Sequence, residues 1–194
     1  TVFESAIQSK EIQYSIDTNV QHKYAVCDKT KLQEIYLNIV SNAIKYTPNG
    51  QAIHVNITET ASDDKKAWYV FICEDTGIGM KQEYLPHIFD EFSREHTATE
   101  NKVVGTGLGL SIVKSFVELM DGKIYVESEQ GKGTKFTVEI PLEIASEEDV
   151  YKKKESEQSV ISDKSIGKRI LLAEDNELNA EIAIELLKEE GILT

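Results

Sequence analysis

Three polar side chains interrupt an otherwise apolar helical segment at regular spacing. Asn38, Asn42 and Lys45 stand at positions i, i+4 and i+7, which share one side of an α-helix. The amide oxygen of Asn42 is a hard ligand that suits a divalent cation bridging phosphates, and the Lys45 ammonium neutralises phosphate charge. A solvated helix face would give the same pattern, so this segment alone decides nothing.

A carboxylate followed by two glycines is the second chemical feature. Asp75 ends an apolar run, and Gly77 and Gly79 let the backbone approach a flat ring. A carboxylate is a natural acceptor for a donor such as the exocyclic amine of adenine. Asp-Thr-Gly also occurs in simple turns and in aspartic proteases. A protease would need a second such loop or a dimer, and Gly79 with the long loop after it favours a nucleotide.

A glycine-rich run at a predicted helix start is the third feature. Free amides and the helix dipole favour anionic phosphates there. The sequence has no Gly-x-x-x-x-Gly-Lys-Ser/Thr loop, and Leu110 stands where a dinucleotide-binding loop has its third glycine, so a dinucleotide fold is disfavoured. The case for a nucleotide site depends on the three segments occurring together. The run consists of Gly105, Thr106, Gly107, Leu108 and Gly109.

Strands and helices must position these groups. Apolar residues at three- and four-residue spacing predict a helix from about Thr30 to Tyr46 and another from Gly109 to Met120. Between them, a short apolar turn around Ile88 leads into a polar segment that we expect to be a long loop. Pro141 is expected to stop the last strand. The predicted strands are 11–16, 24–27, 53–58, 68–73, 124–128 and 136–140.

Composition limits the class of protein. With 40% hydrophobic and 28% charged residues, the chain can bury a core, and its net charge of -13 disfavours nucleic acid as a partner. No apolar run reaches the roughly 18 residues of a membrane helix, so we expect a cytoplasmic chain, anchored in a membrane only through segments absent here. Cys27 and Cys73 lie in apolar strand-like contexts and are expected to be buried thiols.

The pattern changes after residue 145. Residues 146–167 have the charged, serine-containing composition of a linker. Residues 168–194 resume with one buried-strand pattern, the acidic pair Glu174 and Asp175, and one helix pattern. One strand and one helix cannot form a domain, so we expect a second domain that is cut off. The first domain is expected over residues 1–145.

Four segments, in order, resemble the N, G1, F and G2 boxes of sensor histidine kinases in the GHKL superfamily. They are residues 38–46, 75–79, 88–92 and 105–110. The resemblance implies an α+β fold: a two-layer sandwich with a mixed, mostly antiparallel sheet and helices on one face, the Bergerat-type ATP-binding fold. It also implies ATP and Mg²⁺ as cofactors.

Site roles follow from the same resemblance. Asn42 would hold Mg²⁺, Asp75 would receive the adenine amine, Tyr46 would flank the base, and Lys45 and Arg94 would contact phosphates. Residues 86–104 would form the ATP lid. The implied catalytic residues are Asn38, Asn42 and Lys45. The implied nucleotide-binding residues are Tyr46, Asp75, Gly77, Gly79, Arg94, Gly105, Thr106, Gly107, Leu108 and Gly109.

Asn38 separates two activities within this resemblance. ATPases of the gyrase and mismatch-repair type carry a glutamate at that position, whereas a carboxamide cannot accept a proton at neutral pH to activate water. Phosphoryl transfer to a neutral histidine needs no such base. A gyrase-like ATPase, a serine-directed protein kinase on the same fold, and a non-catalytic nucleotide-binding docking module are the alternatives.

The phosphoacceptor of such a kinase is expected outside this sequence. None of His22, His54, His87 and His96 lies in a His-Glu-x-x-Thr/Asn context. The expected partners are therefore ATP or ADP, a histidine phosphoacceptor domain of the same protein and a receiver domain, in a full-length homodimer. Residues 168–194 resemble the start of that receiver domain, which makes the expected protein a hybrid kinase.

Overall fold

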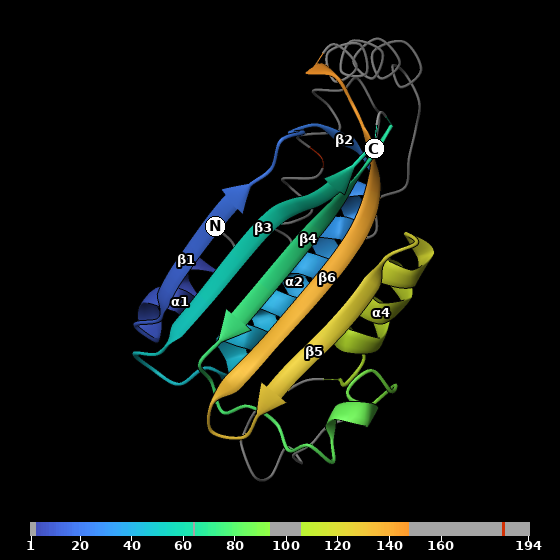
Figure 1. Ribbon diagram of the computed structural model, residues 1–194. Coiled ribbons are helices and arrows are strands. Elements are labelled where there is room, and N and C mark those ends of the chain that lie inside the picture. The colour runs from blue at the N-terminus through green and yellow to red at the C-terminus, as the bar shows by residue number, and fades with distance from the viewer. Residues whose placement is uncertain (1–2, 64, 94–105, 148–183, 185–194) are drawn as a thin grey trace. The chain divides into compact units, whose positions relative to one another are not determined.

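A computed structural model describes residues 3–63, 65–93, 106–147 and 184 of the chain (Figure 1). The backbone divides into two units, residues 1–144 and 145–194. Nearly all of the predicted linker and of the receiver-like segment lies outside the described residues.

The first unit is a six-stranded sheet with helices packed behind it, as Figure 1 shows for α2 and α4. The expected α+β class with a mixed sheet is therefore confirmed. In chain order the elements are α1 (Glu4–Ser9), β1 (Gln13–Asn19), β2 (Ala25–Val26), α2 (Lys29–Tyr46), β3 (Ala52–Ser62), β4 (Lys66–Asp75), the 3-10 helix η1 (Leu85–His87), α4 (Gly109–Leu119), β5 (Lys123–Glu129) and β6 (Gly133–Ile144).

The sheet is mostly antiparallel, and β4 lies inside it. The strand order is β1-β3-β4-β6-β2, and β5 also pairs with β6. Only the pairing of β1 with β3 is parallel among the five described pairings. Asp75 is the last residue of β4 and pairs with Ile53 on one side and Thr134 on the other. The sheet interior thus carries Asp75 to one end of the strands.

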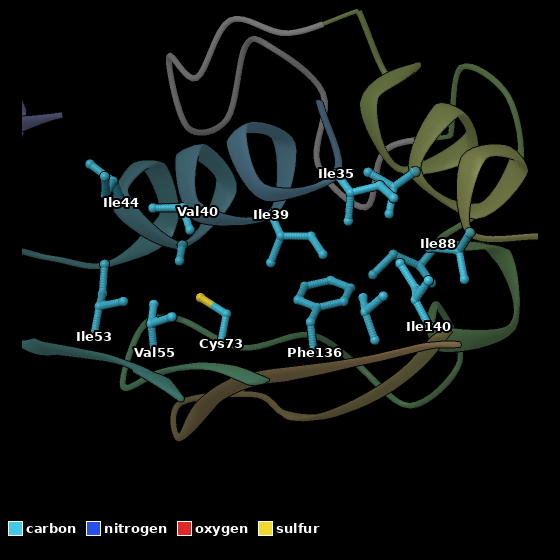
Figure 2. Packing of buried hydrophobic residues seen from close by; sticks show 14 of the residues in the cluster. Ile35, Ile39, Val40, Ile44, Ile53, Val55, Cys73, Ile88, Phe136 and Ile140 are labelled. Carbon is cyan, nitrogen blue, oxygen red and sulfur yellow. The ribbon is translucent and has the colours of Figure 1, made fainter. Parts of the chain in front are cut away.

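Helix α2 forms as its sequence pattern predicts. Asp28 is its N-cap and accepts a hydrogen bond from the Lys31 N–H at 3.1 Å. The helix ends at Tyr46. The next residue, Thr47, has extended backbone because the proline that follows it, Pro48, disfavours helical backbone in the residue before it. Figure 2 shows its apolar stripe facing the sheet, and the buried members are Ile35, Ile39, Val40, Ala43 and Ile44.

Helix α4 completes the helical layer beside α2. Val113 and Val117 have no exposed surface, and Phe116 and Met120 pack against the same core. The helix ends where Asp121 takes a positive φ of 55° and the Gly122 N–H donates to the Val117 carbonyl at 2.9 Å. The glycine itself is needed because a β-carbon there would lie 2.5 Å from the Glu139 carbonyl oxygen.

Two predictions about local structure are wrong. Pro141 does not stop the last strand, because β6 continues to Ile144. Away from β4, the pairing of β6 has a gap between Glu139, which pairs with β5, and Glu143, which pairs with β2. Proline is tolerated in that gap because no ladder hydrogen bond is required of it.

Cys27 is the second correction. It is exposed, whereas Cys73 is buried as predicted, and neither forms a disulfide. Cys27 lies in the connection between β2, which ends at Val26, and α2, and the neighbouring Val26 side chain is exposed as well. Within the described ranges, no helix has the length and apolar character to cross a bilayer.

Ile39→Ala tests the packing of α2 on the sheet. Ile39 is fully buried, so its truncation should lower the free energy of unfolding by about 2–5 kcal/mol, measured by urea denaturation. Gln33→Ala on the exposed side of the same helix is the control and should change it by less than about 0.5 kcal/mol. Equal effects of the two substitutions would contradict this packing.

Candidate functional site

The polar side of α2 contacts the start of α4. The Asn38 amide nitrogen donates to the Glu34 carbonyl at 2.9 Å, which leaves the Asn38 oxygen facing Gly109. A β-carbon on Gly109 would lie 2.6 Å from that oxygen. The first and third sequence segments therefore meet where Asn38 lies against Gly109.

The carboxyl end of α2 contacts the loop after β4. The Ile78 N–H donates to the Tyr46 carbonyl at 3.2 Å. A β-carbon on Gly77 would lie 2.6 Å from that carbonyl oxygen and 2.7 Å from Asp75 Oδ1. Only glycine fits here without displacing the helix end or the carboxylate. The second and third chemical segments thus both contact α2, which carries the first, as a shared site requires.

Asp75 is a buried carboxylate held by backbone donors. Its side chain accepts a hydrogen bond from the Gly77 N–H at 2.9 Å, and the Thr134 N–H also interacts with it. Asp75 is 7% exposed, and this burial raises the pKa of its carboxyl to about 6, although the two backbone donors act in the opposite direction. The carboxyl group therefore sits where a further hydrogen-bond donor would stabilise its charged form.

The hairpin between β5 and β6 supports the loop after Asp75. Ser128 Oγ accepts the Met80 N–H at 2.9 Å and donates to the Gly133 carbonyl at 2.9 Å. It also shares a hydrogen bond of 2.9 Å with the Thr134 hydroxyl. Gly79 has a φ of 61°, and a β-carbon there would overlap the Glu129 carbonyl.

Sequence reasoning did not single out Ser128 or Thr134. Thr134 directly follows the turn at residues 131–133, and this local pattern gives no indication that Thr134 stands opposite Asp75. Thr134 is 9% exposed and stands opposite Asp75 in the register of β4 and β6. A buried hydroxyl beside a buried carboxylate belongs to the site by position.

The second half of α2 and its C-cap residue carry three further polar side chains. The Lys45 ammonium lies 5.2 Å from the centre of the Tyr46 ring, within the range of a cation–π contact. Thr47 is 1% exposed, and its hydroxyl is the one buried side-chain polar atom without a hydrogen-bond partner among the described residues. Asn42 is half-buried on the same helix, one turn after Asn38.

The glycine-rich run reaches α4 with its amides uncapped. Leu108 is the N-cap and provides no side-chain cap, although its own N–H faces the Thr106 hydroxyl at 3.4 Å. The first N–H groups of such a helix lack intrahelical partners and suit an anion. Gly107 has a φ of 75°, and a β-carbon there would lie 2.8 Å from the Phe92 carbonyl carbon. The predicted F segment therefore meets the glycine-rich run.

Some predicted positions lie outside the described residues. These are Arg94, Gly105, His96 and the acidic pair Glu174 and Asp175.

Comparison with known proteins agrees with this geometry. Residues 27–144 match the family model described as "Histidine kinase-, DNA gyrase B-, and HSP90-like ATPase". The chain is 36% identical over 176 residues to the autoinducer 2 sensor kinase/phosphatase LuxQ of Vibrio parahaemolyticus, covering 88% of the chain and 20% of that protein. It is 34% identical over 158 residues to hybrid signal transduction histidine kinase D of Dictyostelium discoideum, covering 81% of the chain and 10% of that protein.

A solved structure gives the same result for the fold. The catalytic domain of histidine kinase ThkA, in a nucleotide-free form, superposes with a TM-score of 0.58 at 28% identity, covering 72% of this chain and 85% of that one. The chain spans only a small part of its curated relatives, at most about a fifth of the two named here. The chain therefore belongs to the family of histidine kinase-, DNA gyrase B- and HSP90-like ATPases, within which it contains a histidine kinase ATP-binding catalytic domain.

Proposed function

We propose that this chain is the catalytic part of a two-component hybrid sensor histidine kinase, which transfers the γ-phosphate of ATP to a histidine on a separate dimerisation domain. The observation that carries the proposal is the buried Asp75 carboxylate, with α2 contacting both the loop after it and the glycine-rich run. One relative is named a sensor kinase/phosphatase and the other a hybrid signal transduction histidine kinase, which supports the same activity.

Adenine recognition is assigned to Asp75. Its two backbone donors leave acceptor capacity on the carboxylate, and the exocyclic amine of adenine is a donor. The absence of β-carbons at Gly77 and Gly79 lets the backbone of this loop pass close to the carboxylate and to the β5–β6 hairpin. Tyr46, whose carbonyl accepts a hydrogen bond from the Ile78 N–H of the same loop, would flank the base.

The phosphates and Mg²⁺ are assigned to α2 and to the start of α4. Asn42 would supply an amide oxygen to the metal, while Lys45, Arg94 and the amides of residues 105–109 would contact phosphates. Among the described residues, no group of three or more His, Cys, Asp and Glu could hold a metal ion. A single amide oxygen from Asn42 together with phosphate oxygens fits Mg²⁺, which is commonly held by few protein ligands together with substrate phosphates.

Asn38 favours transfer to histidine over ATP hydrolysis. Its carboxamide donates to the Glu34 carbonyl and faces Gly109, and a carboxamide has no basic site that could remove a proton from water. The role of this chain would then be positioning and charge neutralisation around the transferred group. A gyrase-like ATPase is the second candidate, since the matched family includes such enzymes.

The described histidines support a phosphoacceptor elsewhere. Each has a local partner: His22 Nδ1 lies 2.8 Å from Glu59 Oε1, His54 Nδ1 lies 2.9 Å from the Ser15 hydroxyl, and His87 Nδ1 lies 2.9 Å from Asp90 Oδ2. We further propose that residues 1–145 form the catalytic domain, 146–167 a linker and 168–194 the start of a receiver domain. The full-length protein would be a homodimer.

Phosphate transfer tests this function directly. The chain, mixed with labelled Mg-ATP and a separate phosphoacceptor-helix domain, should label a histidine of that domain, and Asp75→Asn should lower the labelling at subsaturating ATP by about tenfold or more. Release of labelled phosphate without transfer would favour the ATPase. Nucleotide binding with neither transfer nor release would favour the docking module.

Asp75→Asn should also weaken nucleotide binding itself. An asparagine cannot offer acceptors at both of its terminal atoms, so either the backbone N–H groups or the adenine amine would face an NH₂ group. Titration calorimetry should give an ADP affinity lower by about tenfold to a hundredfold, the loss expected for a hydrogen bond to a charged group. Glu74→Gln, at the exposed neighbouring position, should bind ADP normally. Unchanged binding by Asp75→Asn would reject the assignment.

The raised pKa of Asp75 predicts a pH dependence of stability. Since burial lifts the pKa from 3.8 in the unfolded chain to about 6, the folded state binds more protons between these values. Stability from this group is thus present below about pH 4 and is lost as pH rises through about 6. The unfolding free energy of Asp75→Asn relative to the unchanged chain should rise by up to about 3 kcal/mol between about pH 4 and about pH 7.5, measured by urea denaturation without nucleotide. A pH-independent difference would contradict the burial of this carboxyl.

A further inference from the structure

The Lys10 side chain caps the carboxyl end of α2, although Lys10 lies outside the residues matched by the family model. Its ammonium donates to the carbonyls of Ile44 at 2.7 Å, Lys45 at 3.1 Å and Thr47 at 3.0 Å. The last carbonyls of an α-helix lack intrahelical partners, and a cation there also interacts favourably with the helix dipole. One side chain from the segment after α1 therefore binds three of the terminal carbonyls of the helix that carries the site.

Lys10 does not bind the Tyr46 carbonyl, which is instead bound by the loop after Asp75. The Tyr46 carbonyl accepts the Ile78 N–H, and it lies between the carbonyls of Lys45 and Thr47 that Lys10 binds. The last turn of α2 is thus held by Lys10 through its neighbours and by the loop after Asp75 through Tyr46. A change in the direction of this turn would move the Tyr46 carbonyl away from Ile78.

Lys10 is itself held in place by its backbone. The Lys10 carbonyl accepts the Gly50 N–H at 2.9 Å, which ties it to the turn after α2. Two residues later Ile12 is buried in the core, and the Gln13 N–H donates to the Gln51 carbonyl at 2.9 Å. The ammonium is therefore a preorganised donor, and its contacts require less ordering than those of a mobile surface lysine.

We propose that Lys10 is a positioning residue for the nucleotide site. By holding the last turn of α2, it keeps Tyr46 and the loop from Thr76 to Gly79 in the arrangement that lets Asp75 receive a purine amine. The inference rests on the proposed function of that site. Because Lys10 caps α1, a displacement of α1 would act on the nucleotide site through this ammonium.

Two substitutions of Lys10 separate positioning from general stability. In the 194-residue chain, Lys10→Met keeps an apolar stem but removes the donors, whereas Lys10→Arg keeps a cation. Lys66→Met is the control, since Lys66 is exposed at the other end of β4 from Asp75. Titration calorimetry with Mg-ADP gives affinity, and NMR hydrogen exchange of the Ile78 amide reports the loop without nucleotide.

Lys10→Met should weaken ADP binding by about tenfold and speed the exchange of the Ile78 amide, as the loss of hydrogen bonds from a charged donor implies. Lys10→Arg should restore affinity to within about threefold, and Lys66→Met should change neither quantity. A lower unfolding temperature for Lys10→Met with unchanged affinity and unchanged Ile78 exchange would overturn the inference. Failure of the unchanged chain to bind ADP would instead reject the proposed function, and the Ile78 exchange would still decide whether Lys10 holds the loop.

Discussion

The burial of one carboxylate constrains the rest of this site. Asp75 is carried to the end of an interior strand, where burial opposes its charge and two backbone N–H groups compensate only in part. Such a group raises the free energy of the ionised folded state until another donor reaches it. The surrounding glycines, the β5–β6 hairpin and the end of α2 all lie where they hold this carboxylate and its loop in place.

Helix α2 links the chemistry to the core. Its apolar stripe fixes it on the sheet through residues such as Ile39 and Val40, while its polar side contacts Gly109 and its last carbonyls contact Ile78 and Lys10. The packing that stabilises the fold therefore also sets the distances within the site. In this arrangement a change in the helix layer would directly reach the loop from Thr76 to Gly79, because the Ile78 N–H binds the end of α2.

Helical periodicity in the sequence predicted the extent of α2, and the apolar run before Asp75 predicted the interior position of β4. The joint occurrence of the three glycine- and asparagine-containing segments predicted a shared site, and the resemblance to sensor histidine kinases implied the α+β class. The sequence alone could not predict long-range pairing. The gap in β6 that tolerates Pro141 lies between the start of β5, which pairs with Glu139, and the end of β2, which pairs with Glu143, and the exposure of Cys27 likewise depends on how the short strand β2 is placed. Thr134 and Lys10 were missed for the same reason, because their importance lies in contacts with residues more than 30 positions away.

Comparing ATP with ITP is the most direct test of the central claim, that the Asp75 carboxylate receives an exocyclic amine. The two nucleotides differ at the base, where a carbonyl oxygen in ITP replaces the amine and would face the carboxylate as a second acceptor. Titration calorimetry of the chain in the presence of Mg²⁺ should show ATP binding at least about tenfold more tightly than ITP. Equal affinities would contradict the account, since they would mean that the carboxylate does not read the base.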